Sequence, residues 1–294
     1  MKKFLITTVL LLIISVSFSQ KRVKRQNTSN EEIGISLGVA NYLGDLAWKG
    51  KIPIIEETNP LAFRPAGAFY YRNNFTNFTS FKAGITIGGL YGNDAQTNGD
   101  VSRINRNLHF RSIVADVSVM LEWNVLPYKI GDKVKMFTPY FGIGLAGFYT
   151  NPQAELNGRW IDLQPLGTEG QGVLDGTSKY SLFNFAIPAS FGLKLNVSKR
   201  IALGLEFQYR YTFTDYIDDV SSDFYVSSDL FYNNNIPAIA ADANALSYRA
   251  IDQTITLRAS DQRGSPEAND HYYFVMFSLS YKIGKSGSSC PTFR

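Results

Sequence analysis

Residues 201–213 read Ile-Ala-Leu-Gly-Leu-Glu-Phe-Gln-Tyr-Arg-Tyr-Thr-Phe and alternate between two kinds of side chain. The odd positions are large and apolar or aromatic, and the even positions are small, polar or charged. Because successive side chains of a strand point to opposite faces, this period of two predicts a β-strand with one apolar face. The stretch exceeds the roughly 5–6 residues of an average strand. It is also long enough for a tilted strand to cross a bilayer, which takes roughly 9–11 residues.

Further segments show the same period of two, and together they predict about eight strands. They span residues 33–39, 65–75, 81–91, 113–125, 141–149, 183–197 and 271–283. The first of them is short and rich in glycine.

The links between these segments alternate in length. Short links lie at residue 77, at 128–135 and at 198–200, whereas long links cover 44–64, 92–108, 150–182 and 214–270. Short turns at one end and long loops at the other are typical of outer-membrane barrels. We therefore predict an all-β fold, an antiparallel transmembrane β-barrel of about eight strands in the cell outer membrane. An even number of strands places both termini in the periplasm.

The faces opposite the apolar ones carry six charged residues, Lys82, Asp116, Glu122, Lys194, Glu206 and Arg210. In a membrane barrel these residues would point into the lumen, where eight strands leave room only for side chains. Opposite charges are expected to pair there and to plug the lumen. The alternative is a soluble barrel of the lipocalin kind, in which the apolar side chains would face inward instead.

The ends of the chain are predicted to lie outside the barrel. Lys2 and Lys3 precede an apolar run at 4–14, and Ser17 and Ser19 supply the small residues of a cleavage site, so residues 1–19 are predicted to be a signal peptide. The apolar run is shorter than the roughly 20 residues of a membrane helix. A basic periplasmic tail is expected at 20–32, the barrel at 33–284, and a second periplasmic tail at 285–294.

Composition narrows the range of partners. Charged residues make up 18% of the 294 residues, fewer than the roughly 25% of soluble domains. Without Lys2 and Lys3 the chain is nearly neutral, so no nucleic-acid partner is expected. The single cysteine, Cys290, excludes a disulfide scaffold within the chain. Because the periplasm is oxidising, we expect Cys290 to form an intermolecular disulfide, with a free thiol as the alternative.

One constellation could carry chemistry. Asp270 and His271 begin the last predicted strand, and Asp215, Asp218 and Asp219 follow the preceding one. Neighbouring strands could bring these residues together at the outer mouth of the barrel. There His271 could act as a general base beside the carboxylates, which is the arrangement that a hydrolase would need. The interpretation that we favour is a polar rim beneath a long loop.

No cofactor, metal or small-molecule substrate is expected. The chain has only two histidines, with no clustered third ligand for zinc. Residues 142–147 match the Gly-x-Gly-x-x-Gly dinucleotide fingerprint, but the period of two continues through them and no helix is predicted to follow. Small residues that face the lumen explain the glycines better.

Four segments resemble the PorG-like outer-membrane β-barrel family of Bacteroidetes. They are Trp-Ile-Asp-Leu-Gln-Pro-Leu-Gly-Thr-Glu-Gly-Gln-Gly at 160–172, Tyr-Arg-Tyr-Thr-Phe-Thr-Asp-Tyr-Ile-Asp-Asp-Val-Ser at 209–221, Asn-Tyr-Leu-Gly-Asp-Leu at 41–46 and Asn-Leu-His-Phe-Arg-Ser at 107–112. The resemblance covers about residues 31–284. It implies a non-enzymatic component of the type IX secretion system that is associated with periplasmic ring proteins. A rim enzyme, or an adhesin or receptor that uses the last long loop, is the alternative.

Overall fold

The strands of this computed structural model close into a barrel. The structure describes residues 30–47, 62–96, 101–222, 225–234, 237–252 and 263–283, all within the compact unit Asn30–Ile283. Neighbours in the order β3-β2-β1-β10-β9-β8-β5-β4 are antiparallel, and pairing of β3 with β4 closes the circle. The wall consists of β1 (Glu31–Leu43), β2 (Arg64–Asn74), β3 (Thr79–Asn93), β4 (His109–Asn124), β5 (Phe137–Thr150), β8 (Phe183–Asn196), β9 (Ile201–Thr212) and β10 (His271–Ile283).

The apolar side chains of the wall face outward. On β4 the side chains of Ile113, Val117 and Leu121 are 67%, 59% and 49% exposed, whereas Asp116 and Glu122 are fully buried inside. An outward apolar band around a polar interior is the pattern of a transmembrane barrel. The predicted fold is therefore confirmed, and the lipocalin-like alternative, with its apolar set inside, is wrong.

The first strand is longer than the sequence predicts. β1 begins at Glu31 and ends at Leu43, so the predicted tail at 20–32 overlaps the barrel. Glycine hides the alternation in this strand. A Cβ on Gly38 would lie 1.9 Å from the Val275 carbonyl oxygen, so only glycine allows β10 to approach this closely.

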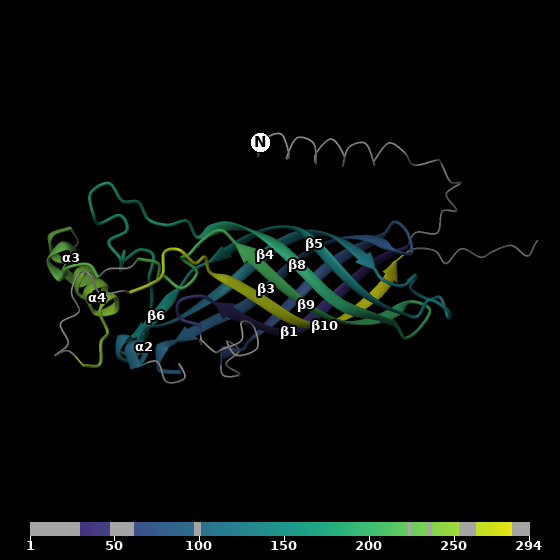
Figure 1. Cartoon of the computed structure of the whole chain (residues 1–294), viewed down its shortest axis with the longest axis horizontal. Helices are drawn as coiled ribbons and strands as arrows, with labels where there is room; N and C mark the ends of the chain where they lie inside the picture. The colour runs from purple at the N-terminus through teal and green to yellow at the C-terminus, as the bar shows by residue number, and fades with distance from the viewer. Residues whose placement is uncertain are drawn as a thin grey trace, which may run out of the picture. The chain divides into compact units, whose positions relative to one another are not determined.

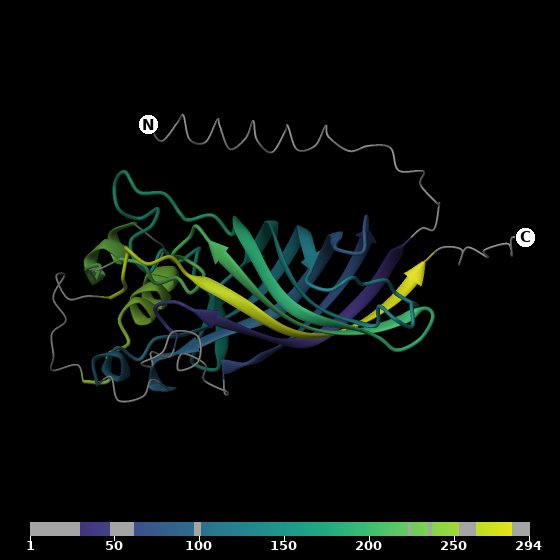
Figure 2. The same ribbon diagram turned by 45° about the vertical axis from the view of Figure 1, so that its right-hand side comes forward.

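The two ends of the barrel differ. Glu31 pairs with Ile283, so the first and last strands start and finish at the end that carries the short turns. We call this the turn end, and we call the opposite end, which carries the long loops, the loop end (Figures 1 and 2). The connections predicted as short and long therefore lie at opposite ends of the barrel.

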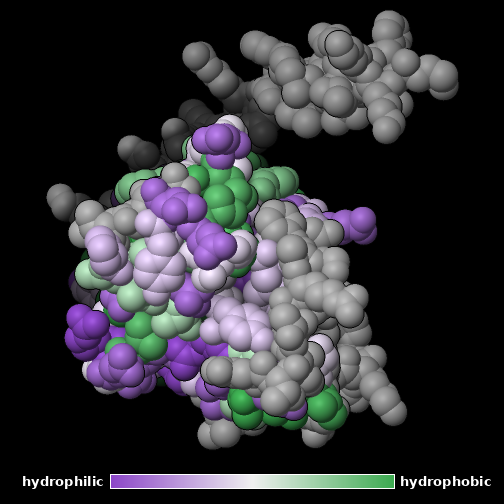
Figure 3. All heavy atoms as spheres, turned by 90° about the vertical axis from the view of Figure 1, so that its left-hand side faces the viewer, coloured by the Kyte–Doolittle hydropathy of each residue, from purple (hydrophilic) through white to green (hydrophobic). Residues whose placement is uncertain are grey.

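The loops at the loop end contain secondary structure that the sequence analysis did not predict. It comprises η2 (Asp94–Gln96), α2 (Val101–Arg106), α3 (Ser228–Asn234), α4 (Pro237–Ser247) and a hairpin of β6 (Gln153–Leu156) and β7 (Arg159–Asp162). Across the described ranges, no helix combines the length and apolar character that membrane crossing requires. Among the described residues, hydrophilic side chains predominate in a view onto the loop end (Figure 3).

One continuous apolar core joins the barrel to these loops. It runs from inward-facing rings such as Phe274, Phe148 and Phe110 to Ile217 and Val220 in the last loop. Tyr42 packs edge to face on Phe110 with ring centroids 4.9 Å apart. We call the loop segments 163–172, 214–222, 228–234, 237–247 and 263–270 the cap. All but the last supply residues to this core, and the ion pair of Arg263 with Glu169 joins the last to them. Because the cap shares a core with the wall, it is part of the folded unit.

Candidate functional site

The six charged residues predicted for the lumen form three buried pairs. Lys82 Nζ lies 2.6 Å from Glu206 Oε2. Arg210 Nε lies 2.6 Å from Asp116 Oδ2. Lys194 Nζ lies 2.7 Å from Glu122 Oε2. Each pair joins two different strands across the interior. All six side chains are almost completely buried.

Two further members, Arg72 and Glu32, were missed by the sequence analysis. Arg72 Nε lies 2.8 Å from Glu122 Oε2, and Arg72 Nη1 lies 3.3 Å from Glu32 Oε2. Glu32 precedes the predicted first strand, and Arg72 follows two tyrosines that obscure the alternation. Strand parity could have found both, because Glu32 pairs with Arg72 and Arg72 with Lys82 on the same face of the wall.

These eight residues form what we call the lumen plug: Glu32, Arg72, Lys82, Asp116, Glu122, Lys194, Glu206 and Arg210. Aromatic rings fill the space between the charges. The Tyr70 ring centroid lies 4.8 Å from Lys82 Nζ, and the Tyr140 centroid lies 4.1 Å from Lys194 Nζ. Lys82 on β3 meets Glu206 on β9, which lies four places along the strand order. Side chains therefore cross the interior and fill it at this level.

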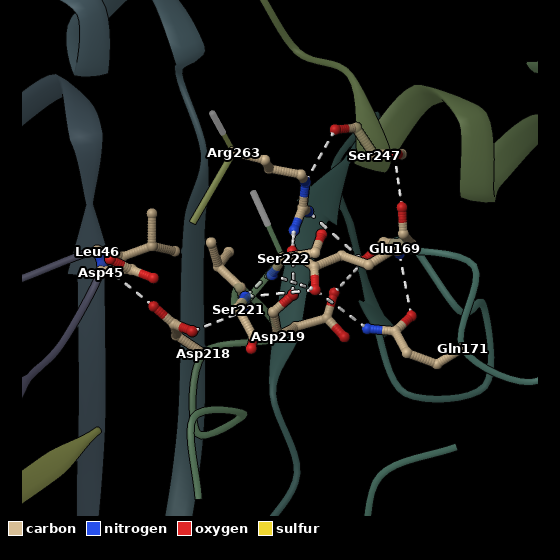
Figure 4. A network of polar contacts seen from close by, with 12 residues as sticks. Asp45, Leu46, Glu169, Gln171, Asp218, Asp219, Ser221, Ser222, Ser247 and Arg263 are labelled. Atoms are coloured by element: carbon tan, nitrogen blue, oxygen red, sulfur yellow. Dashed lines mark hydrogen bonds and ion pairs between the residues drawn. The ribbon is translucent and has the colours of Figure 1, made fainter. Parts of the chain in front are cut away.

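A second polar network holds the cap together (Figure 4). Arg263, which is 2% exposed, forms an ion pair with Glu169 and donates a hydrogen bond of 3.2 Å to the Asp219 carbonyl oxygen. The Glu169 carboxylate also accepts hydrogen bonds from the backbone N–H groups of Ser221 and Ser222. Ser247 Oγ donates to the Thr168 carbonyl oxygen at 2.6 Å, which ties α4 to the same segment.

The segment 163–172, which belongs to the resemblance described above, is thus packed into the cap and does not act as a free spacer. Leu163, Leu166 and Thr168 are all nearly inaccessible. Its glycines serve the turns: Gly167, Gly170 and Gly172 all have positive φ values, which side chains other than glycine rarely adopt.

Two buried acids meet at the barrel mouth. The Tyr42 hydroxyl oxygen lies 2.6 Å from Asp218 Oδ2 and 2.7 Å from Asp270 Oδ1. A phenol has one hydrogen, so it donates to only one of the two carboxyls. The other contact is a hydrogen bond only when that carboxyl is protonated. Burial raises the pKa of Asp218 and of Asp270 well above the usual range, and the charges of Asp45 and Asp218 respectively add to the effect.

His271 does not join these acids. Its Nδ1 accepts a hydrogen bond of 3.3 Å from the Thr212 backbone N–H, and its ring stacks on Tyr211 with centroids 4.8 Å apart. Because His271 follows Asp270 at the start of β10, its side chain lies on the outer wall while the Asp270 carboxyl is fully buried. The less favoured interpretation, a histidine base assembled with carboxylates, is therefore wrong, since strand alternation separates the His271 ring from the Asp270 carboxyl.

Other predicted features occupy structural positions. Gly142 and Gly144 lie within β5, which continues to Thr150 without turning into a helix. A Cβ on Gly144 would lie 1.9 Å from the Val119 carbonyl oxygen, so close packing of β4 on β5 explains this glycine. No cluster of three potential metal ligands occurs among the residues that the structure describes. Cys290 and the two predicted tails beyond residues 30–283 lie outside the described residues.

The cap is expected to resist proteolysis better at about pH 5.5 than at about pH 8.5. Burial raises the pKa of both Asp219 and Asp215 from 3.8 to about 7. In unfolded loops these groups ionise near 3.8, so the folded cap binds more protons between the two values. The two carboxyls contribute fully to the stability of the cap below pH 3.8, and this contribution is lost as the pH rises through about 7.

The measurement is limited proteolysis of the purified barrel, with each rate divided by that of an unstructured substrate at the same pH. Asp219→Asn is expected to flatten the pH dependence. Asp175→Asn, which changes an exposed carboxyl in the loop between β7 and β8, is the control. Faster normalised cleavage of the cap at the lower pH would contradict the prediction.

Comparison with solved structures finds barrels of similar arrangement at very low identity. Neisserial surface protein A matches with a TM-score of 0.41 and 8% identity over 87% of this chain and 98% of that chain. OprG of Pseudomonas aeruginosa matches with a TM-score of 0.38 and 8% identity over 87% of this chain and 98% of that chain. Ail of Yersinia pestis was solved with the heparin analogue sucrose octasulfate. It matches with a TM-score of 0.37 and 8% identity over 86% of this chain and 97% of that chain.

A search of curated proteins finds no match. A family model described as a domain of unknown function, DUF6089, matches residues 3–234, which is most of the chain. The chain therefore belongs to the DUF6089 family.

Proposed function

We propose that this protein is a non-enzymatic outer-membrane component of a protein-export machine of the type IX kind, where it holds periplasmic ring proteins at the membrane. The turn end faces the periplasm with both termini, and the loop end faces outward. The short turns and the long loops at opposite ends of the barrel, with β1 beginning and β10 ending at the turn end, support this orientation. The resemblance of segments 160–172 and 209–221 to PorG-like barrels supports the secretion role.

The filled lumen is the observation that carries the proposal. Four cations and four carboxylates pair across the interior, and the cap continues the buried core above them. A barrel filled in this way offers no path for a solute, so its function involves its outer surfaces and not its lumen. Anchoring of other proteins is the surface function that fits a plugged barrel whose first strand begins, and whose last strand ends, at the turn end.

The turn end offers a surface for an anchored partner. Exposed cations on its turns include Lys133, Lys199 and Arg200. Complementary charge guides association and fixes the register of a protein interface. An acidic face on a periplasmic ring protein fits this surface.

A second candidate function, a surface receptor or adhesin, is favoured by one observation. The cap is an ordered structure with exposed apolar residues on its helices, such as Tyr232 on α3 and Ile239 on α4. Such residues on an outward-facing domain could contact an extracellular partner. The two candidates use opposite ends of the barrel.

Affinity purification of the full chain from outer membranes in mild detergent tests the proposal. Periplasmic ring proteins are expected to co-purify with the unaltered protein. Charge reversal at the turn end (Lys133→Glu, Lys199→Glu and Arg200→Glu together) is expected to lose them. Reversal of the exposed loop-end cations Arg159 and Lys179 is the matched control and should retain them. The anchoring role would be contradicted if no periplasmic protein co-purified, or if both charge-reversal variants lost the ring proteins equally.

Cys290 provides an independent prediction about the partner. Within this chain it has no second cysteine to pair with, so a disulfide must be intermolecular. Non-reducing gels of outer membranes should show a larger species that disappears with reductant and in Cys290→Ser. If the untreated protein runs only as a monomer, the covalent link is absent, and anchoring would rest on non-covalent contacts alone.

A further inference from the structure

The outer wall of the barrel carries a groove near the loop end. It spans β1 to β4, with a volume of about 1020 Å³. Its floor includes Gly67 and Gly89, and its apolar sides are Leu37, Ile87 and Ile113. These three side chains are 69%, 55% and 67% exposed on the face that meets the membrane.

Missing side chains create the groove. Gly67 pairs with Leu37 on one side and Ile87 on the other, and Gly89 pairs with Ile113. Gly67 thus lies among large outward residues with no side chain of its own, whereas the Arg64 side chain occupies the space beside Gly89, because a Cβ there would lie 2.8 Å from the Arg64 Cβ. A Cβ on Gly67 would meet its nearest atoms at 3.7 Å, which is ordinary contact, so the backbone does not require glycine at this position.

Two arginines stand at the loop end of the groove. The Arg64 guanidinium carbon lies 4.1 Å from the centroid of the Tyr91 ring, and that of Arg111 lies 3.8 Å from the centroid of the Trp160 ring. Arg111 Nε also donates a hydrogen bond of 3.2 Å to Gln153 Oε1. Among the described residues that line the groove, none is acidic.

The hairpin of β6 and β7 sets the position of Arg111. Gln153 belongs to β6 and Trp160 to β7, and the hairpin joins the wall through pairing of Arg111 with Gln153. The guanidinium is therefore held between an amide and an indole. Tryptophan and tyrosine favour the level of lipid headgroups, so these rings place both cations at that level.

We propose that this groove binds one lipid with a phosphate in its headgroup, the phosphate on Arg64 and Arg111 and an acyl chain along Leu37, Ile87 and Ile113. The groove lies on the lipid-facing wall, so an acyl chain is the apolar group available to fill it. Guanidinium groups bind phosphate through paired charge-assisted hydrogen bonds. A cationic site at the headgroup level matches a lipid phosphate in charge. Only the leaflet that supplies the lipid depends on the orientation proposed above.

Native mass spectrometry of the full-length barrel tests the site with phosphatidic acid, with diacylglycerol of the same chains and with inorganic phosphate. Phosphatidic acid is expected to stay bound at collision energies that strip diacylglycerol. Arg64→Gln combined with Arg111→Gln should weaken this binding by about tenfold or more. Gly67→Leu should weaken it similarly by filling the groove.

Matched variants separate the site from general effects. Gly147→Leu places the same side chain on the outer wall of β5, where the nearest atom to a Cβ is 4.0 Å away, and Arg200→Gln removes the same charge at the turn end. Both should bind phosphatidic acid normally. Heat-modifiable mobility on gels shows whether each variant is folded. If Gly67→Leu does not fold, the double arginine variant alone tests whether the groove binds phosphatidic acid.

Three results would overturn the proposal: equal retention of diacylglycerol, undiminished binding in the arginine variant, or equal binding of inorganic phosphate alone. Co-purification of ring proteins is measured separately, so the failure of either proposal leaves the other standing.

Discussion

Replacement of Glu122 with alanine is expected to lower the free energy of unfolding by about 3–5 kcal/mol. Glu122 is fully buried and pairs with both Arg72 and Lys194. Its loss leaves Lys194 buried without its carboxylate partner and leaves Arg72 with Glu32 alone. Removal of one partner from a buried pair is far more damaging than loss of an exposed pair, because the uncompensated charge remains.

Unfolding by guanidinium in phospholipid vesicles, followed by tryptophan fluorescence, measures this cost. Glu155→Ala is the matched control, because Glu155 lies exposed on the β6–β7 hairpin, and it should change stability by less than about 0.5 kcal/mol. A second control replaces both members of one pair. Lys82→Met alone should be costly, whereas Lys82→Met with Glu206→Gln should recover most of the loss, because no buried charge is left unpaired. Equal stability of Glu122→Ala and Glu155→Ala would show that the plug contributes nothing.

The barrel wall could be predicted from the sequence because the membrane imposes a strict alternation on it. The period of two at 201–213 identifies both β9 and its lumen-facing residues, among them Glu206 and Arg210. The rule fails where inward residues are small. In β1 the inward glycines weaken the alternation, so the predicted strand begins at residue 33 and leaves out Glu32. Local pattern therefore predicts the wall well and the first strand poorly.

The cap could not be predicted in the same way, because contacts between distant loops create it. Arg263 and Glu169 lie 94 positions apart, and no periodicity links them. The sequence does contain one local signal for these loops. Leu156 pairs with Arg159 across Asn157-Gly158, and both turn residues have positive φ values. Asn-Gly between short strands is a strong hairpin signal, and it would have predicted the element that positions Arg111.

The interpretation of Asp270 and His271 failed for a related reason. Neighbours in a strand point to opposite faces, so one enters the buried mouth and the other lies on the outer wall. The same alternation that identified the barrel thus separates the two groups. The four acids do gather as expected, but as a buried part of the cap.

Replacement of Leu205 with arginine is expected to destabilise the barrel by about 2–4 kcal/mol, because it puts a charge near the middle of the lipid-facing band. Leu205 lies well inside β9 and pairs with the outward-facing residues Leu193 and Phe277. Both neighbours are exposed on the outer wall, at 42% and 70%. A guanidinium at this position has only acyl chains around it.

Ile201→Arg is the matched control on the same face of the same strand. Ile201 is the first residue of β9, at the turn end, where the side chain can reach the headgroups. The cost there should fall to about 0–1 kcal/mol. Both variants are measured by guanidinium unfolding in vesicles. A depth-dependent cost requires a bilayer around the wall, whereas a soluble barrel with the same exposed residues would tolerate arginine equally at both positions. Equal costs would therefore contradict the membrane-spanning assignment itself, and with it every inference that relies on lipid at this surface.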